Sequence, residues 1–487
     1  MSQIYDVAII GAGSSGICAA IQLKKIGLEN FIILEKGDDV GGTWFWNRYP
    51  GAECDVQSHL YSFSFEPNPS WTQPFAGQQE ILTYLKHCAE KYELSKHLKF
   101  RCLVTDCNWS DKMAYWQLIS GEDERITAKI VISALGMFNK IVWPKIEGIN
   151  KFKGELFHSA RWDHDVSLKN KNVGVVGIAA SAVQFAPEIC NEVNTLSLYQ
   201  RTANWVVPKP NVPYTKAELA SLSDEENLRQ SRNKVFEQWD SLCTFQDKSI
   251  MAEIERSGLE RIAEVQDPVV RRQLTPNHPF GCKRPLFSDK FYPIFNRKNV
   301  ELLCDPIKSV TGNGIETEKC TNKHDVLIFS TGFETTTYLN AINVSGRDGI
   351  NLRDAWDDGP QAYLGITTSG FPNLFMLYGP NTNQGCILYM IEKQVEYTIR
   401  QITRIRKQGL RWIDLDPAVQ KQFNEKIQQE ISQVDVWQAS CGNDFYYRAG
   451  NSGRLVTQWP NSMTAYDRAI NSSDEGIYLS DAKRAEV

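Results

Sequence analysis

The 487-residue sequence lacks any run of about 18 consecutive apolar residues, the length that a membrane-spanning helix needs. It also lacks a basic excess, because 53 Lys and Arg stand against 58 Asp and Glu, a net charge of −5. A nucleic-acid-binding protein usually shows the opposite balance. The N-terminus, Met1–Asp6, runs straight into a strand pattern and leaves no room for a signal peptide. We therefore expect no membrane span, no nucleic-acid partner and a cytoplasmic location.

Signatures of metal binding and of disulfide scaffolds are missing as well. The twelve cysteines are scattered from Cys18 to Cys441 with no CxxC pair, and the seven histidines show no HxxxH spacing. In a long chain without a secretion signal, this pattern favours reduced thiols and predicts no metal site. Aromatic residues, in contrast, are abundant: 13 Trp, 18 Tyr and 22 Phe exceed what a minimal core needs and suit a large ligand pocket.

The first recognisable unit is a strand, a glycine-rich turn and a helix. Asp6–Ile10 is a mostly apolar run typical of a buried parallel strand. The turn Gly11–Gly16 follows, then a helix over Ile17–Ile26 that Gly27 is placed to end, and a second strand over Phe31–Glu35. This order predicts a βαβ unit with a GxGxxG turn between its first strand and its helix.

Each glycine of this turn has a physical role in binding a dinucleotide. Gly11 permits the tight turn, Gly13 lets the backbone approach a pyrophosphate, and Gly16 allows close packing of helix and strand. Glu35 follows Gly16 by 19 positions and can accept hydrogen bonds from the ribose hydroxyls. A glycine-rich turn without a ligand is the alternative, and the strand before and helix after the turn weigh against it.

A second unit of the same kind begins at residue 173. Val173–Val176 is a strand, Gly177–Ala182 a tight turn, Val183–Cys190 a helix start and Thr195–Arg201 the following strand. The middle glycine of the motif is replaced by Ala179, whose methyl group points where a pyrophosphate comes close. This departure puts tight nucleotide binding at the second turn in question.

The end of the second unit nevertheless favours NADP. Arg201 and Thr202 place a cation and a hydroxyl where an acid would stand for NAD, and this combination suits a 2′-phosphate. A strand-end arginine that only meets solvent is the alternative interpretation.

The rest of the chain completes the expected organisation. Strands at Ile130–Gly136 and Asp325–Gly332 are each expected to close one nucleotide-binding lobe. Tyr214–Gln273 carries charged residues and leucine at helical spacing and predicts a solvated helical insertion. Residues 346–360 are expected to form a surface loop, and the polar tail from Ser472 is expected to be frayed.

The predicted fold class is α/β, with two Rossmann-like dinucleotide-binding domains and a helical insertion. We expect a discontinuous FAD-binding domain over 1–148 and 321–487. The NADP-binding domain is expected over 149–213 and 274–320, and the insertion over 214–273.

Two dinucleotide units suggest a flavin with a nicotinamide, and hence a flavoprotein oxidoreductase. A disulfide reductase of this layout would carry a redox cysteine at the Gly41–Thr43 turn, where this chain has Trp44. Cys102 and Cys107 belong to a different segment, so their spacing is interpreted as coincidence. Oxygen is then the expected electron acceptor.

The segment between the two units carries the most specific motif. It matches FxGxxxHxxxWD through Phe152, Gly154, His158, Trp162 and Asp163. In this segment the chain resembles type I Baeyer–Villiger monooxygenases, which are class B flavoprotein monooxygenases of the flavin-containing monooxygenase superfamily. Related enzymes that oxidise nitrogen and sulfur carry a similar segment but usually lack its Trp-Asp ending.

The resemblance covers roughly residues 4–470. Further matching segments are Gly41–Ala52, Cys54–Asp55, Gln200–Trp205, Cys282–Pro285, Phe371–Phe375, Tyr378–Asn383 and Trp459–Pro460. Three positions depart from the family: Ala179, Asp444-Phe445-Tyr446 where many relatives have Ser-Trp-Tyr, and Gln384-Gly385-Cys386 where relatives often have Leu-Gly-His. These departures concern the contacts with the nicotinamide coenzyme and the substrate.

The resemblance implies roles for individual residues. It implies FAD contacts at Gly11, Gly13, Gly16, Glu35, Thr43, Trp44, Trp46, Asp55, Tyr61 and, near the adenine, Val104. It implies NADP contacts at Gly177, Ala179, Ser181, Ala182, Arg201, Thr202 and Lys283. Arg284 would be the catalytic arginine, held and tuned by Asp55, and His158 would act through conformational change in a linker.

The activity implied is an NADPH- and O₂-dependent conversion of small-molecule ketones to esters or lactones through a C4a-peroxyflavin. A permanently charged guanidinium suits that chemistry, because it stabilises an anion without protonating it. Two alternatives stay open. One is an oxygenase of sulfur or nitrogen centres, with a sulfide as substrate, and the other is a degenerate FAD-binding redox sensor, for which Ala179 is the main support.

Overall fold

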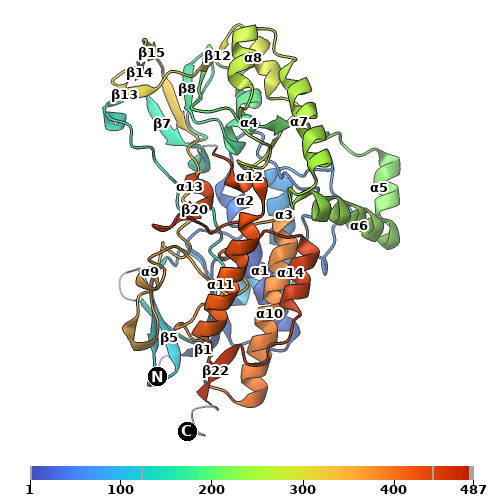
Figure 1. The fold of residues 1–487 in the computed structure, drawn as a ribbon, viewed down its shortest axis with the longest axis vertical. Helices are drawn as coiled ribbons and strands as arrows, with labels where there is room; N and C mark the ends of the chain where they lie inside the picture. Colours follow the sequence, from blue (N-terminus) through green and yellow to red (C-terminus); the bar gives the residue numbers. More distant parts are fainter. Residues whose placement is uncertain (1–2, 122–123, 441–443, 482–487) are drawn as a thin grey trace.

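The computed structural model describes residues 3–121, 124–440 and 444–481. Two sheets at opposite ends of the long axis organise the molecule, with a group of helices projecting to one side (Figure 1). Both sheets contain parallel strands joined by helices, so the α/β fold class with two Rossmann-like units is confirmed.

The first sheet has eight strands in the order β17-β4-β5-β6-β1-β2-β3, with β18 also paired to β6. Its strands are β1 (Ile4–Ile10), β2 (Phe31–Leu34), β3 (Leu98–Lys99), β4 (Val104–Ser110), β5 (Tyr115–Ser120), β6 (Glu124–Ser133), β17 (Asn343–Ser345) and β18 (Leu374–Met376). The predicted strand at the start of the chain is therefore β1, which pairs in parallel with β2 and with β6. Residues 130–133 form the end of β6, which lies inside this sheet beside β1 and also pairs with β18.

Helices cover one face of the first sheet. They are α1 (Ser14–Lys25), α3 (Gln78–Lys91), α10 (Ile387–Gln408), α11 (Pro417–Ser432) and α14 (Met463–Ile470). Val7 and Ile9 of β1 share one core with residues of α1 and α10, whereas Ala8 and Ile10 share the opposite core with residues of β4, β5 and β6. The strand is thus buried on both sides, which explains its nearly unbroken apolar sequence.

The second sheet is parallel throughout, in the order β12-β9-β8-β16-β7. Its strands are β7 (Glu155–His158), β8 (Asn172–Val176), β9 (Thr195–Tyr199), β12 (Val300–Leu303) and β16 (Val326–Phe329), and α4 (Ala180–Ile189) packs on it. A small antiparallel sheet of β13 (Ile307–Thr311), β14 (Gly314–Thr317) and β15 (Thr321–Lys323) lies beside it. Because β16 pairs with β7 and β8, it lies in the second sheet, although the expected boundary at residue 321 assigns it to the FAD-binding domain.

The predicted helical insertion is present as α5 (Lys216–Leu222), α6 (Glu225–Leu242), α7 (Lys248–Ile262) and α8 (Pro268–Leu274). A capping side chain stands before each helix: Thr215, Asp224, Asp247 and Asp267 accept backbone N–H groups of the first turn. Helix α6 is not merely solvated, because Arg232 reaches the first unit and donates to the backbone oxygens of His59 and Ser62.

The remaining elements are short. They are α2 (Thr43–Trp46), α9 (Leu352–Ala355), α12 (Asp435–Gln438), α13 (Asp444–Tyr447), β10 (Val206–Val207), β11 (Leu286–Phe287), β19 (Ile413–Leu415), β20 (Arg448–Ala449), β21 (Arg454–Leu455) and β22 (Tyr478–Ser480). Single 3-10 turns occur at Leu94–His97, Ile149–Lys151, Ser159–Arg161, Tyr292–Asn296 and Arg347–Gly349.

Two local expectations are wrong. Residues 346–360 are not simply a surface loop, because they contain α9 and bury Leu352 and Trp356. The described part of the tail after Ser472 is not frayed, because β22 pairs with β19 and buries Tyr478, whose hydroxyl contacts that of Tyr397. In both segments a few buried apolar side chains anchor a mostly polar sequence.

Among the described residues, ten cysteines have free thiols, in line with the expectation of reduced thiols. Cys282 departs from this expectation, because its thiol is in a disulfide bond.

Candidate active site

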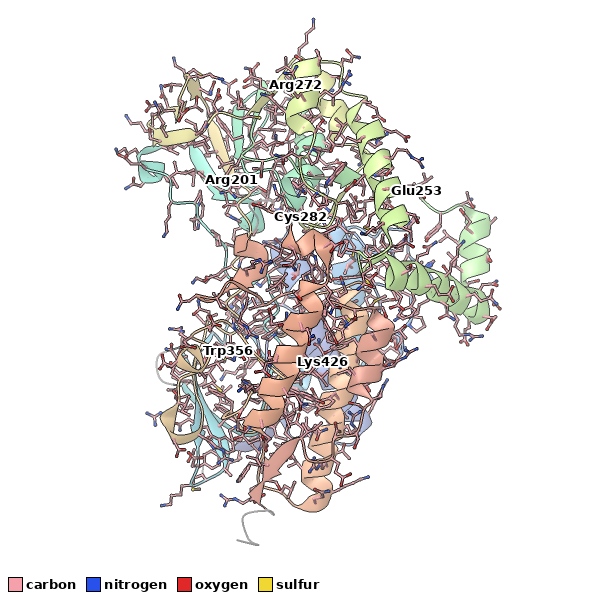
Figure 2. All side chains as sticks on the ribbon, viewed as in Figure 1. Arg201, Glu253, Arg272, Cys282, Trp356 and Lys426 are labelled. Carbon is pink, nitrogen blue, oxygen red and sulfur yellow. The ribbon has the colours of Figure 1, made fainter. Side chains whose placement is uncertain are left out.

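A cavity of about 1110 Å³ lies between the two sheets and is lined by both predicted glycine turns. Its volume exceeds the range of about 300–1,000 Å³ that is usual for a single small-molecule site. Figure 2 shows Arg201 and Cys282, the neighbour of Lys283, near the junction of the two units. The cavity is thus large enough, and placed, to take more than one ligand.

The first glycine turn folds as its sequence predicts. Gly11 has φ +106°, and a Cβ there would lie 2.7 Å from the backbone oxygen of Ala134, so only glycine fits. Gly16 does not line the cavity but packs against Gly11, where a Cβ would meet the Gly11 oxygen at 2.0 Å. Gly13 stands at the N-cap of α1 and lines the cavity. The turn therefore offers bare backbone to a ligand at a helix N-terminus.

Glu35 lines the same cavity at the end of β2 and is 4% exposed. One carboxylate oxygen accepts from Ala12 N–H at 2.8 Å and the other from Gly37 N–H at 2.7 Å. Each oxygen has a second acceptor position, so the carboxylate can still receive ribose hydroxyls. The position of Glu35 fits the predicted nucleotide contact.

Aromatic residues of the following loop border the cavity. Thr43, Trp44 and Trp46 lie on α2, and the Trp44 indole donates to the Tyr61 hydroxyl at 3.1 Å. Val104 also lines the cavity. These residues, with Glu35 and the first turn, surround one continuous space that suits an extended dinucleotide such as FAD.

The second turn is only partly as predicted. Gly177, Ala179 and Ser181 line the cavity, but Ala182 is fully buried in the core of the second sheet and does not face it. Ala179 has φ −129°, a conformation that any residue adopts, so its methyl group causes no backbone strain. The Ala179 methyl group therefore reduces the space for a phosphate at the turn without distorting the backbone.

The predicted phosphate-binding cluster is assembled beyond β9. Arg201, Thr202 and Lys283 all line the cavity, and the Lys283 ammonium donates to Thr202 Oγ1 at 2.5 Å and to the Ala203 oxygen at 3.1 Å. Burial and the nearby Arg201 lower the pKa of Lys283 to about 8. Within residues 3–121, 124–440 and 444–481, no carboxylate forms an ion pair with Arg201 or Lys283, and a bound anion would stabilise two such neighbouring cations.

Arg284 and Asp55 meet at the junction of the two units. Arg284 Nη2 lies 3.6 Å from Asp55 Oδ2, and the Arg284 side chain is 38% exposed toward the cavity. Burial alone would lower the pKa of Arg284, but Tyr446 and Asp55 raise it above its ordinary value. The guanidinium is therefore permanently charged, held on one side and open to the cavity on the other.

The fingerprint segment lies outside the cavity. His158 is the last residue of β7 and 1% exposed, and its ring stacks edge-on against Trp143 and Phe333. Burial and Arg161 lower its pKa to about 4, so the ring is neutral near pH 7. Its Nδ1 accepts from Ala160 N–H at 3.1 Å. This position suits packing between the units and excludes direct contact with a ligand in the cavity.

The other fingerprint residues are structural as well. Trp162 packs against Phe157 and Phe185, and Asp163 accepts the Asp165 N–H. A Cβ on Gly154 would meet the Asp325 oxygen at 2.3 Å. The motif therefore holds β7 against β16 and α4 rather than binding a ligand.

Several residues of the site escaped the sequence analysis. Tyr446 also lines the cavity, and its proximity raises the pKa of Arg284. Tyr49 donates to the Gln184 side chain of α4 at 2.9 Å, and the Gln184 amide donates to the backbone oxygen of Glu53 at 3.0 Å. Gly51, in the same loop, is pressed on α4, since a Cβ there would lie 2.8 Å from the Gln184 oxygen. No local pattern marks such contacts, because they join segments more than 100 residues apart.

Two features of the described residues are negative. No group of three or more His, Cys, Asp or Glu side chains is arranged to hold a metal within residues 3–121, 124–440 and 444–481. No helix in that part of the chain is long and apolar enough to cross a membrane. The side chains of Asp444 and Phe445, at one of the departures from the family pattern, lie outside the described residues.

Comparison with protein families gives a match over residues 8–301 to pyridine nucleotide-disulphide oxidoreductases. This match reflects the two-nucleotide layout; the turn that would carry a redox cysteine has Trp44. Solved structures of similar fold include OTEMO in complex with FAD and NADP and cyclohexanone monooxygenase in a closed form. Each has a TM-score of 0.89, with 28% and 29% sequence identity, and in each case 99% of this chain and 100% of the other is covered.

Curated relatives agree with the structural neighbours. A Baeyer–Villiger monooxygenase of Pseudomonas aeruginosa is 38% identical over 97% of this chain and 90% of its own length. Another, of Streptomyces coelicolor, is 35% identical over 98% of this chain and 93% of its own. Together with the cavity between two dinucleotide turns and the arginine at its centre, these similarities show that the chain belongs to the Baeyer–Villiger monooxygenase family.

Proposed function

We propose that the protein is an FAD-containing, NADPH- and O₂-dependent Baeyer–Villiger monooxygenase that converts ketones to esters or lactones. The observation that carries this proposal is the position of Arg284. It lines the same cavity as the two glycine turns and is paired there with Asp55. A flavin and a nicotinamide held by these turns would bring their reactive rings to the same region.

The residues of the cavity fit both cofactors. Bare backbone at Gly11 and Gly13, with Glu35 beside them, suits the pyrophosphate and ribose of FAD. When bound, FAD supplies the redox and oxygen-activating chemistry. Trp44, Trp46, Tyr61 and Asp55 border the space that remains for the ring system.

NADP is supported by the cations of the second unit. Arg201 and Lys283 provide two positive charges, and Thr202 a hydroxyl, at one end of the cavity. A 2′-phosphate satisfies all three groups, whereas the free hydroxyl of NAD would leave two like charges facing each other.

Arg284 supplies the electrostatic part of the reaction. Negative charge develops on the ketone oxygen as the carbonyl is attacked, and a fixed guanidinium stabilises it without giving up a proton. Asp55 holds the guanidinium through an ion pair, and Tyr446 and Asp55 both raise its pKa.

The domain assignment is part of the proposal. FAD belongs to the unit formed by residues 1–148 and by the chain after β16, and NADP to residues 149–213 and 274–320 together with β15 and β16. Residues 214–273 are the insertion. The ten free thiols support a cytoplasmic location, and the substrate is a small-molecule ketone.

The proposal is tested by replacing Arg284 with alanine. We expect Arg284→Ala to retain FAD and to oxidise NADPH, but to form no ester from a panel of linear, cyclic and aryl ketones, as measured by mass spectrometry of the products. Arg272→Ala, at an exposed position of α8, is the matched control and should leave ester yields unchanged. Ester formation by Arg284→Ala would contradict the assigned role.

A thioether included in the same panel separates ketone oxygenation from oxidation of sulfur. A native enzyme that converts the thioether but none of the ketones would contradict the proposal in favour of the sulfur-oxidising alternative.

A further inference from the structure

A second cation lies behind the Asp55–Arg284 pair. The side chain of Lys209, which follows β10, is 1% exposed, and its ammonium lies 3.3 Å from Asp55 Oδ1. Arg284 Nη2 approaches the other oxygen of the same carboxylate. Asp55 is thus shared by two cations, one at each oxygen.

Lys209 has a carboxylate of its own as well. Its ammonium lies 2.9 Å from Glu53 Oε1, and the Asn211 amide donates to Glu53 Oε2 at 2.9 Å. Burial would lower the pKa of Lys209, but Asp55 and Glu53 raise it above its ordinary value, so the ammonium remains charged. The cluster contains two carboxylates and two cations and is electrically balanced.

This balance determines where the Arg284 guanidinium can lie. With Lys209 in place, Asp55 divides its attraction between two cations, and the guanidinium stays partly open to the cavity. Without Lys209, the carboxylates of Glu53 and Asp55 would be left with Arg284 as the one remaining cation of the cluster. Coulombic attraction would then draw the guanidinium toward them, and uncompensated negative charge would remain beside the site where further negative charge develops.

We propose that Lys209, with Glu53 as its counterion, is a positioning residue for the monooxygenase reaction that keeps Arg284 directed into the cavity by occupying one oxygen of Asp55. The inference rests on the proposed function, in which Arg284 stabilises charge on the ketone oxygen. A purely structural role is the competing explanation, since the Lys209 ammonium also lies 5.2 Å from the centre of the Phe75 ring.

Three variants separate the two explanations. Lys209→Met keeps the length of the side chain and removes its charge, Lys209→Arg keeps the charge, and Glu53→Gln/Lys209→Met restores the charge balance without the ammonium. Lys393→Met is the matched control, because Lys393 of α10 is a half-buried lysine paired with Glu396 and Asp467, and it does not line the cavity.

Each protein is loaded with FAD and assayed for ester formation, for hydrogen peroxide release and for the KM of NADPH. We expect Lys209→Met to lower kcat for the ester about tenfold and to divert NADPH oxidation to hydrogen peroxide, with the KM for NADPH unchanged. The double variant and Lys209→Arg should return to within about threefold of the native kcat. Lys393→Met should match the native protein.

Thermal unfolding without substrate gives an independent measurement. The double variant should melt at a higher temperature than Lys209→Met, because the latter buries an unbalanced carboxylate. If Lys209→Met does not retain FAD, the native protein, Lys209→Arg and the double variant still decide the question.

A double variant with a kcat as low as one tenth of native would overturn the inference, since it would show that charge balance is not what the lysine provides. Native activity and coupling in Lys209→Met would overturn it too. The proposed function fails separately, through ester formation by Arg284→Ala.

Discussion

At the scale of single residues, the site depends on charged groups whose environment differs from water. Lys283 illustrates this most directly, since burial and Arg201 bring its pKa down to about 8. Its ammonium is positive below that pH and neutral above it. Two of its three N–H groups already reach Thr202 and Ala203, which leaves one for a ligand.

We therefore predict that the affinity for NADPH falls as the pH rises through about 8. The KM for NADPH should increase about tenfold between pH 7 and pH 9.5, because a neutral amine no longer attracts the 2′-phosphate. Steady-state kinetics across this range measure the effect, with NADH, which lacks that phosphate, as the control. Lys283→Met should show a high KM at every pH, and a native KM for NADPH that parallels the KM for NADH would contradict the prediction.

Residue by residue, the sequence was informative where chemistry follows from local spacing. The roles of Gly11 and Gly16, and the position of Arg201 at the end of β9, follow from motif geometry. Lys209 and Glu53 could not be identified, because an isolated lysine after a strand has no pattern and its partner stands 156 positions earlier. The burial of the Ala182 side chain was not foreseen, because α4 turns that side chain into the core of the second sheet.

At the scale of elements, the β1–α1 turn is the most constrained part of the FAD site. We predict that Gly16→Ala abolishes FAD retention, because the added Cβ would lie 2.0 Å from the Gly11 oxygen and force β1 and α1 apart. The absorbance of the purified protein near 450 nm measures bound flavin. Gly27→Ala is the control. Gly27 stands just after the C-terminal end of α1 with φ +71°, and a Cβ added there would have no atom within 4 Å. This variant should cost about 1 kcal/mol of stability and keep its flavin.

Helix α6 shows how the insertion is attached to the first unit. Arg232 Nη2 lies 3.5 Å from Glu392 Oε2, and the Glu392 side chain is 6% exposed. Burial raises the pKa of Glu392, and Arg232 and Ser64 oppose this effect. The insertion is therefore fixed to α10 by a buried ion pair and not by apolar contact alone.

Arg232→Met is predicted to lower the free energy of unfolding by about 3 kcal/mol, because it leaves a buried carboxylate without its cation. Chemical denaturation at several pH values measures this cost, which should shrink as the pH falls, since a protonated Glu392 carries no charge to bury. Arg229→Met is the control, because the Arg229–Glu226 pair on the same helix is exposed to solvent and should contribute much less to stability than the buried pair. Equal losses in both variants would contradict the prediction.

Elements with strong periodicity were predicted well, and short ones were not. Strands β1, β2, β8 and β9 follow from apolar runs, and the helical character of the insertion follows from the helical spacing of its charged residues and leucines. Helix α9 and strand β22 each contain only a few residues, and their formation depends on burying Trp356 and Tyr478 against distant segments. Such tertiary anchoring has no local signature.

At the scale of the whole molecule, the cavity belongs to neither unit alone. Residues of both units line it, so a dinucleotide bound there contacts both units. The sequence predicted both units but not how they face each other, because their relative orientation depends on contacts such as Tyr49 with Gln184.

A ligand that bridges the units should stabilise the entire fold. We predict that NADP⁺ at about 100 times its Kd increases the stability of the FAD-loaded protein by about 2.7 kcal/mol and raises Tm in a single transition. Differential scanning calorimetry measures this effect, with NAD⁺ at the same concentration as control. Two separate transitions, of which NADP⁺ shifts only one, would contradict the prediction and indicate units that unfold independently.

The loop that carries Tyr49, Gly51 and Glu53 is seated on α4, only a few residues before Asp55. Any rigid-body swing of the nicotinamide-binding half must either carry this loop along or break its two hydrogen bonds, at a cost of about 1 kcal/mol each. The position of the Asp55 carboxylate is thereby coupled to movements of the NADP-binding half of the enzyme.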